Sequence, residues 1–189
     1  MDLALRQFMT QAQALAASSG RAFPAPSPGL ILLILFVASV TVGPVINALF
    51  AFGEEFGWTG YLVVKLLPLG KWTTAILYGL IWGLWHAPII ALGHDYPGHP
   101  WAGIAFMCPL MIAVGFSQLA LRLRYGSIFF TTFLHACLNA QLFGIWGILF
   151  VDLNPLLGGM TGIVGLALAA PVGAWLLARS CTESCSAKA

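Results

Sequence analysis

The chain has 189 residues, of which 60% are hydrophobic and 7% are charged, and its mean hydropathy is +0.92. A soluble domain carries about a quarter charged residues, so this composition excludes a soluble globular protein and indicates a membrane protein. The formal net charge of +2 is too small to indicate a nucleic-acid partner.

The amino-terminal segment, residues 1–28, is polar or rich in Ala and is interpreted as an interfacial stretch followed by a linker with three prolines. We expect no secretory signal peptide, because the first long apolar run starts only at Leu30. Residues 29–180 are predicted to form one transmembrane bundle, and residues 181–189 a short tail.

Five apolar segments are expected within the bundle. They run from about Leu30 to Leu67, Trp72 to Leu92, Trp101 to Leu121, Ser127 to Phe150 and Gly158 to Ala178. The first is too long for one straight span of about 20 residues, and we expect the helix to break or kink at Gly43 and Pro44. The predicted fold is therefore an all-α polytopic transmembrane helix bundle of five or six spans.

Most cations mark one end of this bundle. That end holds Lys65, Lys71, Arg122, Arg124, Arg179 and Lys188, whereas the two loops at the other end hold no Lys or Arg. The positive-inside rule predicts that the first end is cytoplasmic. The amino-terminal arginines lie on the opposite side if the first segment crosses once, and on the cytoplasmic side if it folds back as a hairpin at Pro44. We expect a multi-pass protein of a prokaryotic plasma membrane, surrounded by lipids.

Polar residues inside the apolar segments share one depth. Glu54, His86, His135 and Asn139 each lie 11 to 15 residues from a cytoplasmic Lys or Arg, which is a depth of roughly 16 to 22 Å. A single His or Asn in a span is most often hydrogen-bonding glue between helices. Three segments that bring polar groups to one level, with two adjacent carboxylates at Glu54 and Glu55, favour a functional site, since each buried carboxylate costs roughly 2.5 to 3.5 kcal/mol.

One loop at the far end also contains residues of metal-binding type. It reads His94-Asp95-Tyr96-Pro97-Gly98-His99. Its Pro and Gly are typical of a turn, so we interpret this loop as an exposed turn rather than a metal site.

Three motifs in order resemble a known family. They are Gly53-Glu54-Glu55-Phe56-Gly57-Trp58-Thr59-Gly60-Tyr61-Leu62, then Ile81-Trp82-Gly83-Leu84-Trp85-His86-Ala87-Pro88, and then Arg124-Tyr125-Gly126-Ser127-Ile128 leading to His135-Ala136-Cys137-Leu138-Asn139. Their order and spacing are similar to those of the CPBP (Abi) family of intramembrane proteases, which are related to the CAAX prenyl endopeptidase and to bacteriocin-processing or immunity proteins. The resemblance covers about Pro44 to Phe150.

The resemblance implies an endopeptidase whose candidate catalytic residues are Glu54, Glu55, His86, His135 and Asn139. Glu54 would activate a water as general base with the aid of His86, while His135 and Asn139 stabilise the oxyanion. In an alternative version, Glu54, His86 and His135 hold zinc with a water in the fourth position. The metal-independent version is slightly favoured, and no HExxH sequence decides between the two. The expected substrate is a peptide or protein, prenylated or not.

The chain departs from the family pattern at two positions. Trp82 stands where the second motif usually has Phe, and this exchange could keep the packing beside His86. Thr59 replaces the arginine of the first motif, so we expect Glu55 to be protonated or to find another donor, such as the Thr59 hydroxyl. This replacement leaves open a non-catalytic binding or immunity protein of the same fold, and a small proton-coupled transporter is a third alternative.

The family usually has more spans before the glutamate helix than this sequence offers. We therefore expect a truncated or minimal version, whose bundle a partner chain could complete.

Overall fold

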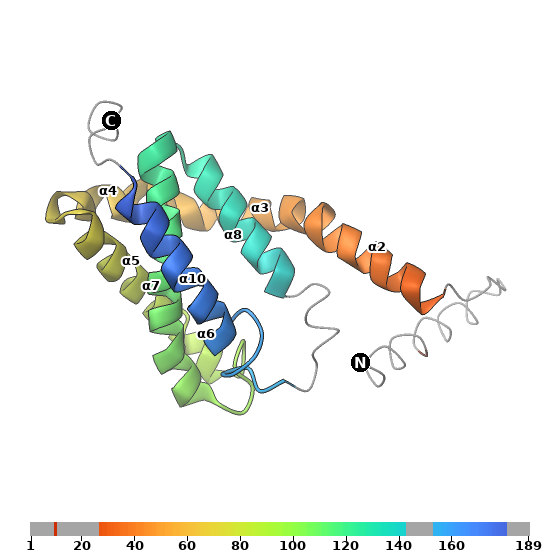
Figure 1. Cartoon of the computed structure of the whole chain (residues 1–189). Helices are drawn as coiled ribbons and strands as arrows, with labels where there is room; N and C mark the ends of the chain where they lie inside the picture. The colour runs from red at the N-terminus through yellow and green to blue at the C-terminus, as the bar shows by residue number, and fades with distance from the viewer. Residues whose placement is uncertain (1–9, 11–26, 143–152, 181–189) are drawn as a thin grey trace.

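The computed structural model describes Thr10 and residues 27–142 and 153–180. Every regular element in these ranges is a helix, which confirms the predicted all-α fold (Figure 1). In chain order they are α2 Pro28–Val40, α3 Val42–Glu55, η1 Phe56–Leu62, α4 Val63–Leu66, η2 Leu67–Leu69, α5 Lys71–Trp85, α6 Ala87–Ala91, α7 Pro100–Tyr125, α8 Ile128–Leu142 and α10 Ile163–Ala178. Most of the expected interfacial segment, the end of the fourth apolar segment and the tail lie outside the described residues.

The helices have the length and composition of membrane spans. Three helical runs are long and apolar enough to cross a membrane, namely Gly29–Leu69, Lys71–Ala91 and Pro100–Tyr125, and α8 and α10 are apolar but shorter. Large apolar side chains such as Leu49 and Phe50 are more than 70% exposed. Side chains of this kind are suited to lipid, so the chain is an integral membrane protein with several apolar helices.

The first apolar segment is interrupted, but two residues earlier than Gly43. α2 ends at Val40, and Thr41 joins it to α3. Pro44 explains this position, because proline has no N–H and its ring crowds the carbonyl four residues before it, which is that of Val40. Figure 1 shows α2 continuing onward from α3 rather than folding back beside it, so the hairpin alternative at Pro44 is wrong.

The centre of the bundle is α7, which packs against α5 and α10, while α3 packs against α8. Two glycines set the distance between α5 and α7. A Cβ atom at Gly83 would lie 2.7 Å from the Cα of Cys108, and one at Gly79 would collide with the backbone of Ile112. The two helices therefore meet backbone to backbone, as membrane helices do where small residues recur every four positions.

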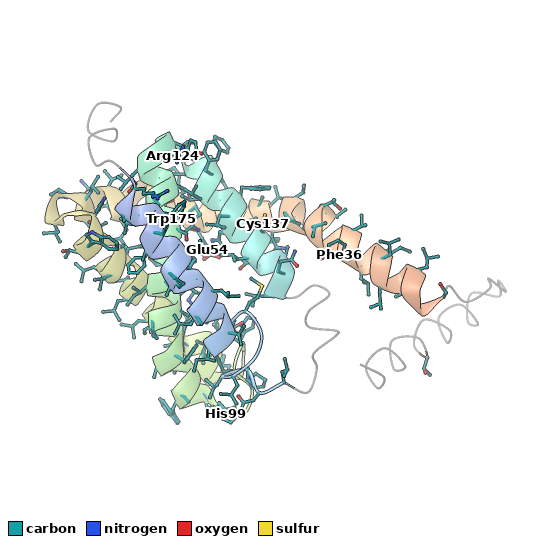
Figure 2. All side chains as sticks on the ribbon, viewed as in Figure 1. Phe36, Glu54, His99, Arg124, Cys137 and Trp175 are labelled. Atoms are coloured by element: carbon teal, nitrogen blue, oxygen red, sulfur yellow. The ribbon has the colours of Figure 1, made fainter. Side chains whose placement is uncertain are left out.

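The two ends of the bundle are fixed by separate contacts. At one end, Lys71 Nζ donates to the carbonyls of Ala178 and Ser180 at 3.2 and 2.8 Å. At the other end, the Tyr96 hydroxyl donates to the carbonyl of Thr161 at 2.7 Å. In Figure 2, Arg124 and His99 mark these two ends and Glu54 lies between them. The described cations of the predicted cytoplasmic group thus lie together.

Candidate active site

A cavity of about 220 Å³ lies among α3, α5, α7, α8 and the segment before α10. Its wall is formed by Glu54, Trp82, Trp85, His86, Ile89, His94, Asp95, Met107, Leu110, Met111, Val114, His135, Leu138, Asn139, Leu142, Met160 and Thr161. The wall includes Glu54, His86, His135 and Asn139, so the structure brings together the four residues that share one depth in the sequence. Glu55 does not line this cavity.

His86 lies where one helix ends and the next begins. α5 ends at Trp85 and α6 begins at Ala87, because Pro88 has no N–H and crowds the turn before it. The His86 Nδ1 atom lies 2.7 Å from the carbonyl oxygen of Trp82. A carbonyl oxygen only accepts, so Nδ1 carries the hydrogen, and Nε2 of the neutral ring is an acceptor. The sequence predicted one apolar segment from Trp72 to Leu92, and the break at His86 within it was not predicted.

Glu54 is reached from a second hollow as well. A more open groove of about 460 Å³ runs along η1 and α5 and is lined by Gly53, Glu54, Gly57, Trp58, Tyr61, Leu62, Ile81 and Trp85. Tyr61 is 61% exposed and belongs to the outer surface of the bundle. Glu54 and Trp85 line both hollows, so the carboxylate stands at the boundary between the outer surface and the cavity.

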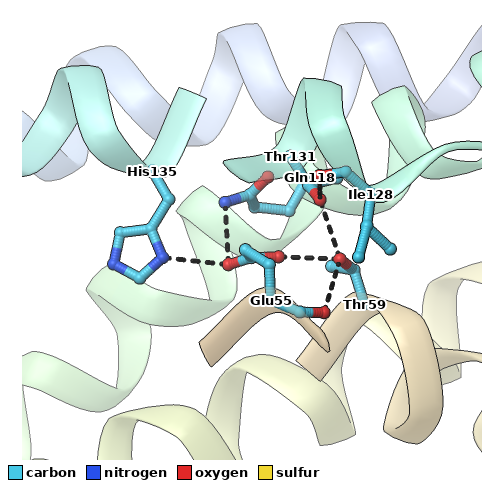
Figure 3. A network of polar contacts seen from close by, with 6 residues as sticks. All are labelled: Glu55, Thr59, Gln118, Ile128, Thr131 and His135. Atoms are coloured by element: carbon cyan, nitrogen blue, oxygen red, sulfur yellow. Dashed lines mark hydrogen bonds and ion pairs between the residues drawn. The ribbon is translucent and has the colours of Figure 1, made fainter. Parts of the chain in front are cut away.

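Glu55 is the centre of a buried hydrogen-bond network (Figure 3). Its Oε2 accepts from the Thr59 hydroxyl at 2.7 Å, and its Oε1 lies 3.0 Å from His135 Nδ1 and accepts from Gln118 Nε2 at 3.4 Å. The Thr59 hydroxyl lies 2.8 Å from that of Thr131. All five side chains belong to residues that are at most 5% exposed. The expectation that Thr59 supplies a donor to Glu55 is confirmed.

The turn after Glu55 is wider than an α-helical turn. η1 is a π-helix, and at its end Val63 N–H donates to the carbonyl of Trp58, five residues back. Arg122 Nε on α7 donates to the carbonyl of Thr59 at 3.1 Å, which ties this turn to the centre of the bundle. π-helical turns are rare and are frequent at functional sites, and no signal in the sequence indicated this one.

The sequence analysis also missed Gln118 and Thr131. Gln118 is an amide inside the apolar run of α7, and it is completely buried. As a polar side chain inside an apolar span, this amide is of the same kind as His86, His135 and Asn139 and was visible in the sequence for the same reason. Thr131 gives a weaker signal, because threonine hydroxyls in helices often bond their own backbone, as this one does to the carbonyl of Ile128 at 2.8 Å.

Trp82 fills the space between the two imidazoles. Its ring meets the His135 ring nearly edge-on at a centroid distance of 5.1 Å, and the His86 ring lies at 6.0 Å. Trp82 is 2% exposed. The aromatic residue at this position of the second motif therefore packs beside His86, as expected, and touches His135 as well.

The described side chains form no preassembled metal-ligand cluster. Among residues 27–142 and 153–180, no group of three or more His, Cys, Asp or Glu side chains is close enough to hold a metal ion. Glu54, His86 and His135 line the same cavity, and zinc binding by these three residues stays a prediction.

Comparisons with known proteins place these features in a family. A family model described as type II CAAX prenyl endopeptidase Rce1-like matches residues 28–141, which include every residue of the Glu55 network and the four polar cavity residues. No curated protein and no solved structure matches the chain.

Proposed function

The chain belongs to the type II CAAX prenyl endopeptidase Rce1-like family, and from this premise we propose that it is an intramembrane endopeptidase in which Glu54 activates the attacking water. One observation carries this proposal. A carboxylate, two imidazoles and an amide from three helices line a single cavity inside an apolar bundle. Groups of these types are the ones that peptide hydrolysis requires, and nothing in apolar packing requires them.

In the proposed reaction, Glu54 takes a proton from a water molecule whose oxygen attacks the carbonyl carbon of the scissile peptide bond. His86 helps to orient this water, because its Nε2 is an acceptor once Nδ1 is bound to the Trp82 carbonyl. When the carbon–nitrogen bond breaks, the proton held by Glu54 passes to the leaving amine. The water is thereby divided between the new carboxyl group and the new amino group.

His135 and Asn139 are proposed to donate hydrogen bonds to the oxyanion. Asn139 can donate from its amide, but His135 needs a hydrogen on Nε2 while its Nδ1 faces Glu55 at 3.0 Å. Two arrangements satisfy this: a Glu55 carboxylate with an imidazolium, or a protonated Glu55 with a neutral ring. Both hold the same number of protons, and both make the buried pair neutral overall, which costs less in an apolar interior than a lone negative charge.

The outer groove supports a substrate that approaches from the lipid. Apart from Glu54, this groove is lined mostly by glycines and by aromatic and aliphatic side chains. We infer that an apolar or lipid-anchored segment lies along it, with the scissile bond beside Glu54. Whether the substrate is prenylated is a question for the assay.

The test is peptide cleavage by purified wild type and Glu54→Gln in detergent or liposomes, followed by mass spectrometry on prenylated and unprenylated peptides, with and without a chelator. Loss of the general base should lower the cleavage rate by about 10²- to 10⁴-fold. His99→Gln is a matched control, because His99 is exposed and does not line the cavity. Unchanged cleavage by Glu54→Gln would overturn the assignment of Glu54 as general base. Loss of wild-type cleavage on addition of the chelator would support the metal-dependent mechanism instead.

A further inference from the structure

The cavity extends well beyond the four proposed catalytic groups. Its wall continues from His86 along α6 to His94 and Asp95, in the loop between α6 and α7, and to Thr161 before α10. Gly93 follows His86 at a sequence separation of seven in a mostly helical stretch, which is a rise of roughly 10 Å, and Asp95 lies two positions further on. An extended peptide covers this distance with about three residues.

The loop holds Asp95 in an unusual backbone conformation. Asp95 is the only described residue other than glycine with a positive φ, at 58°, and the Tyr96 N–H donates to the carbonyl of His94 across it at 2.6 Å. Such a conformation costs energy, and it persists only where the surroundings enforce it. Here the enforcing neighbour is Tyr96, which is fully buried and bonded to the carbonyl of Thr161.

The buried Tyr96 thereby holds the neighbouring Asp95 in the wall of the cavity. The Asp95 side chain is 9% exposed, and its Oδ2 lies 3.0 Å from His94 Nδ1. The described part of the wall contains two carboxylates, Glu54 and Asp95, and no Lys or Arg. Through this contact, His94 fixes the direction of the Asp95 carboxylate. The group that complements this part of the cavity is therefore a cation.

We propose that Asp95, oriented by His94, forms a subsite for a Lys or Arg side chain of the substrate, about three residues from the scissile bond. The subsite proposal rests on the proposed endopeptidase function, because the subsite would bind that enzyme's substrate. Peptide binding to Asp95 can nevertheless be measured without cleavage. Asp95 touches the substrate and not the reacting atoms, so it determines specificity, and His94 is a positioning residue.

The experiment uses matched peptides that carry Lys, Gln or Glu at each position from two to four residues on either side of the scissile bond. Wild type should cleave the best Lys peptide with a kcat/KM about tenfold above that of its Gln partner, as expected for a charge-assisted contact. In Asp95→Asn this preference should fall to within about twofold. Asn suits the control because it tolerates a positive φ and removes only the charge.

Binding is measured in parallel with fluorescent Lys and Gln peptides in the Glu54→Gln background, with and without Asp95→Asn. A Kd ratio of about ten that disappears with Asp95→Asn supports the subsite even if wild type cleaves nothing, in which case the protease proposal fails alone. Equal binding of both peptides, or a preference that survives Asp95→Asn, overturns the subsite. His94→Asn should reduce the preference and His99→Asn should not, since only His94 lines the cavity.

Discussion

Glu54 and Glu55 are neighbours in the chain, yet they lie in opposite kinds of surroundings. Glu54 is partly exposed and borders two hollows, and no described residue hydrogen-bonds its carboxylate. Glu55 is completely buried and has three hydrogen-bond partners, Thr59, Gln118 and His135. The difference arises because successive residues of a helix point about 100° apart.

This contrast separates two uses of a carboxylate inside a membrane. A carboxylate whose acceptor sites are all satisfied stabilises the packing around it, and it is not available to a water. A carboxylate with open acceptor sites beside a cavity can take a proton. We therefore expect substitutions at Glu55 to reduce stability and substitutions at Glu54 to reduce activity.

The largest expected effect is a difference in stability between Glu55→Ala and Glu54→Ala. Glu55→Ala should lower the free energy of unfolding by about 3 kcal/mol, because three buried polar groups lose their hydrogen-bond partner. Glu54→Ala should change it by less than about 1 kcal/mol, since no hydrogen bond between described residues is lost. Denaturant unfolding in detergent micelles, followed by Trp fluorescence, measures both. Equal losses would remove the distinction between the two glutamates.

A smaller effect is expected at Thr59, where two substitutions test the contribution of the hydroxyl group to the Glu55 network. Thr59→Val keeps the shape and removes the hydroxyl that donates to Glu55, so the free energy of unfolding should fall by about 2 kcal/mol. Thr59→Ser keeps the hydroxyl and should lose about half of that or less. The same micelle unfolding assay applies. A Val variant as stable as the Ser variant would show that the hydroxyl does not support Glu55.

The smallest effect is expected at Gln118. Its amide nitrogen lies 3.4 Å from Glu55, and its Oε1 is buried without a partner among the described residues. Gln118→Met removes a long hydrogen bond together with an unsatisfied oxygen, and these contributions oppose each other. The change in the free energy of unfolding should stay below about 1 kcal/mol. A loss as large as that of Thr59→Val would mean that Gln118 is a principal donor to Glu55.

The sequence predicted which of these polar residues lie near one another, because position along a helix follows from counting residues at a constant rise. Glu54, His86, His135 and Asn139 were placed at one level from their distance to flanking cations, and they do line one cavity. The apolar runs predicted the helices for a similar reason, since length and hydropathy are properties of each segment alone.

The direction in which a side chain points around its helix axis could not be predicted in the same way. Which of the two glutamates faces inward depends on neighbouring helices and on the widened turn of η1, and neither is encoded locally. The break at His86 could have been predicted, because Pro88 was visible in the sequence. The role of Asp95 could not, since the contact of its loop with the segment before α10 joins residues far apart in the chain.

The glycine seam between α5 and α7 determines how freely α5 can vary by mutation. Gly79 and Gly83 leave no room for a methyl group, whereas Leu80 and Leu84 point outward and are 37% and 52% exposed. A mutational library could exchange the outward residues for other apolar ones at little cost, while almost any change at the two glycines would shift the helix along or away from α7. His86 lies three residues beyond Gly83, so such a shift would move its imidazole relative to Glu54. The two glycines of α5 thus hold His86, which directly follows this helix, at a constant position relative to Glu54.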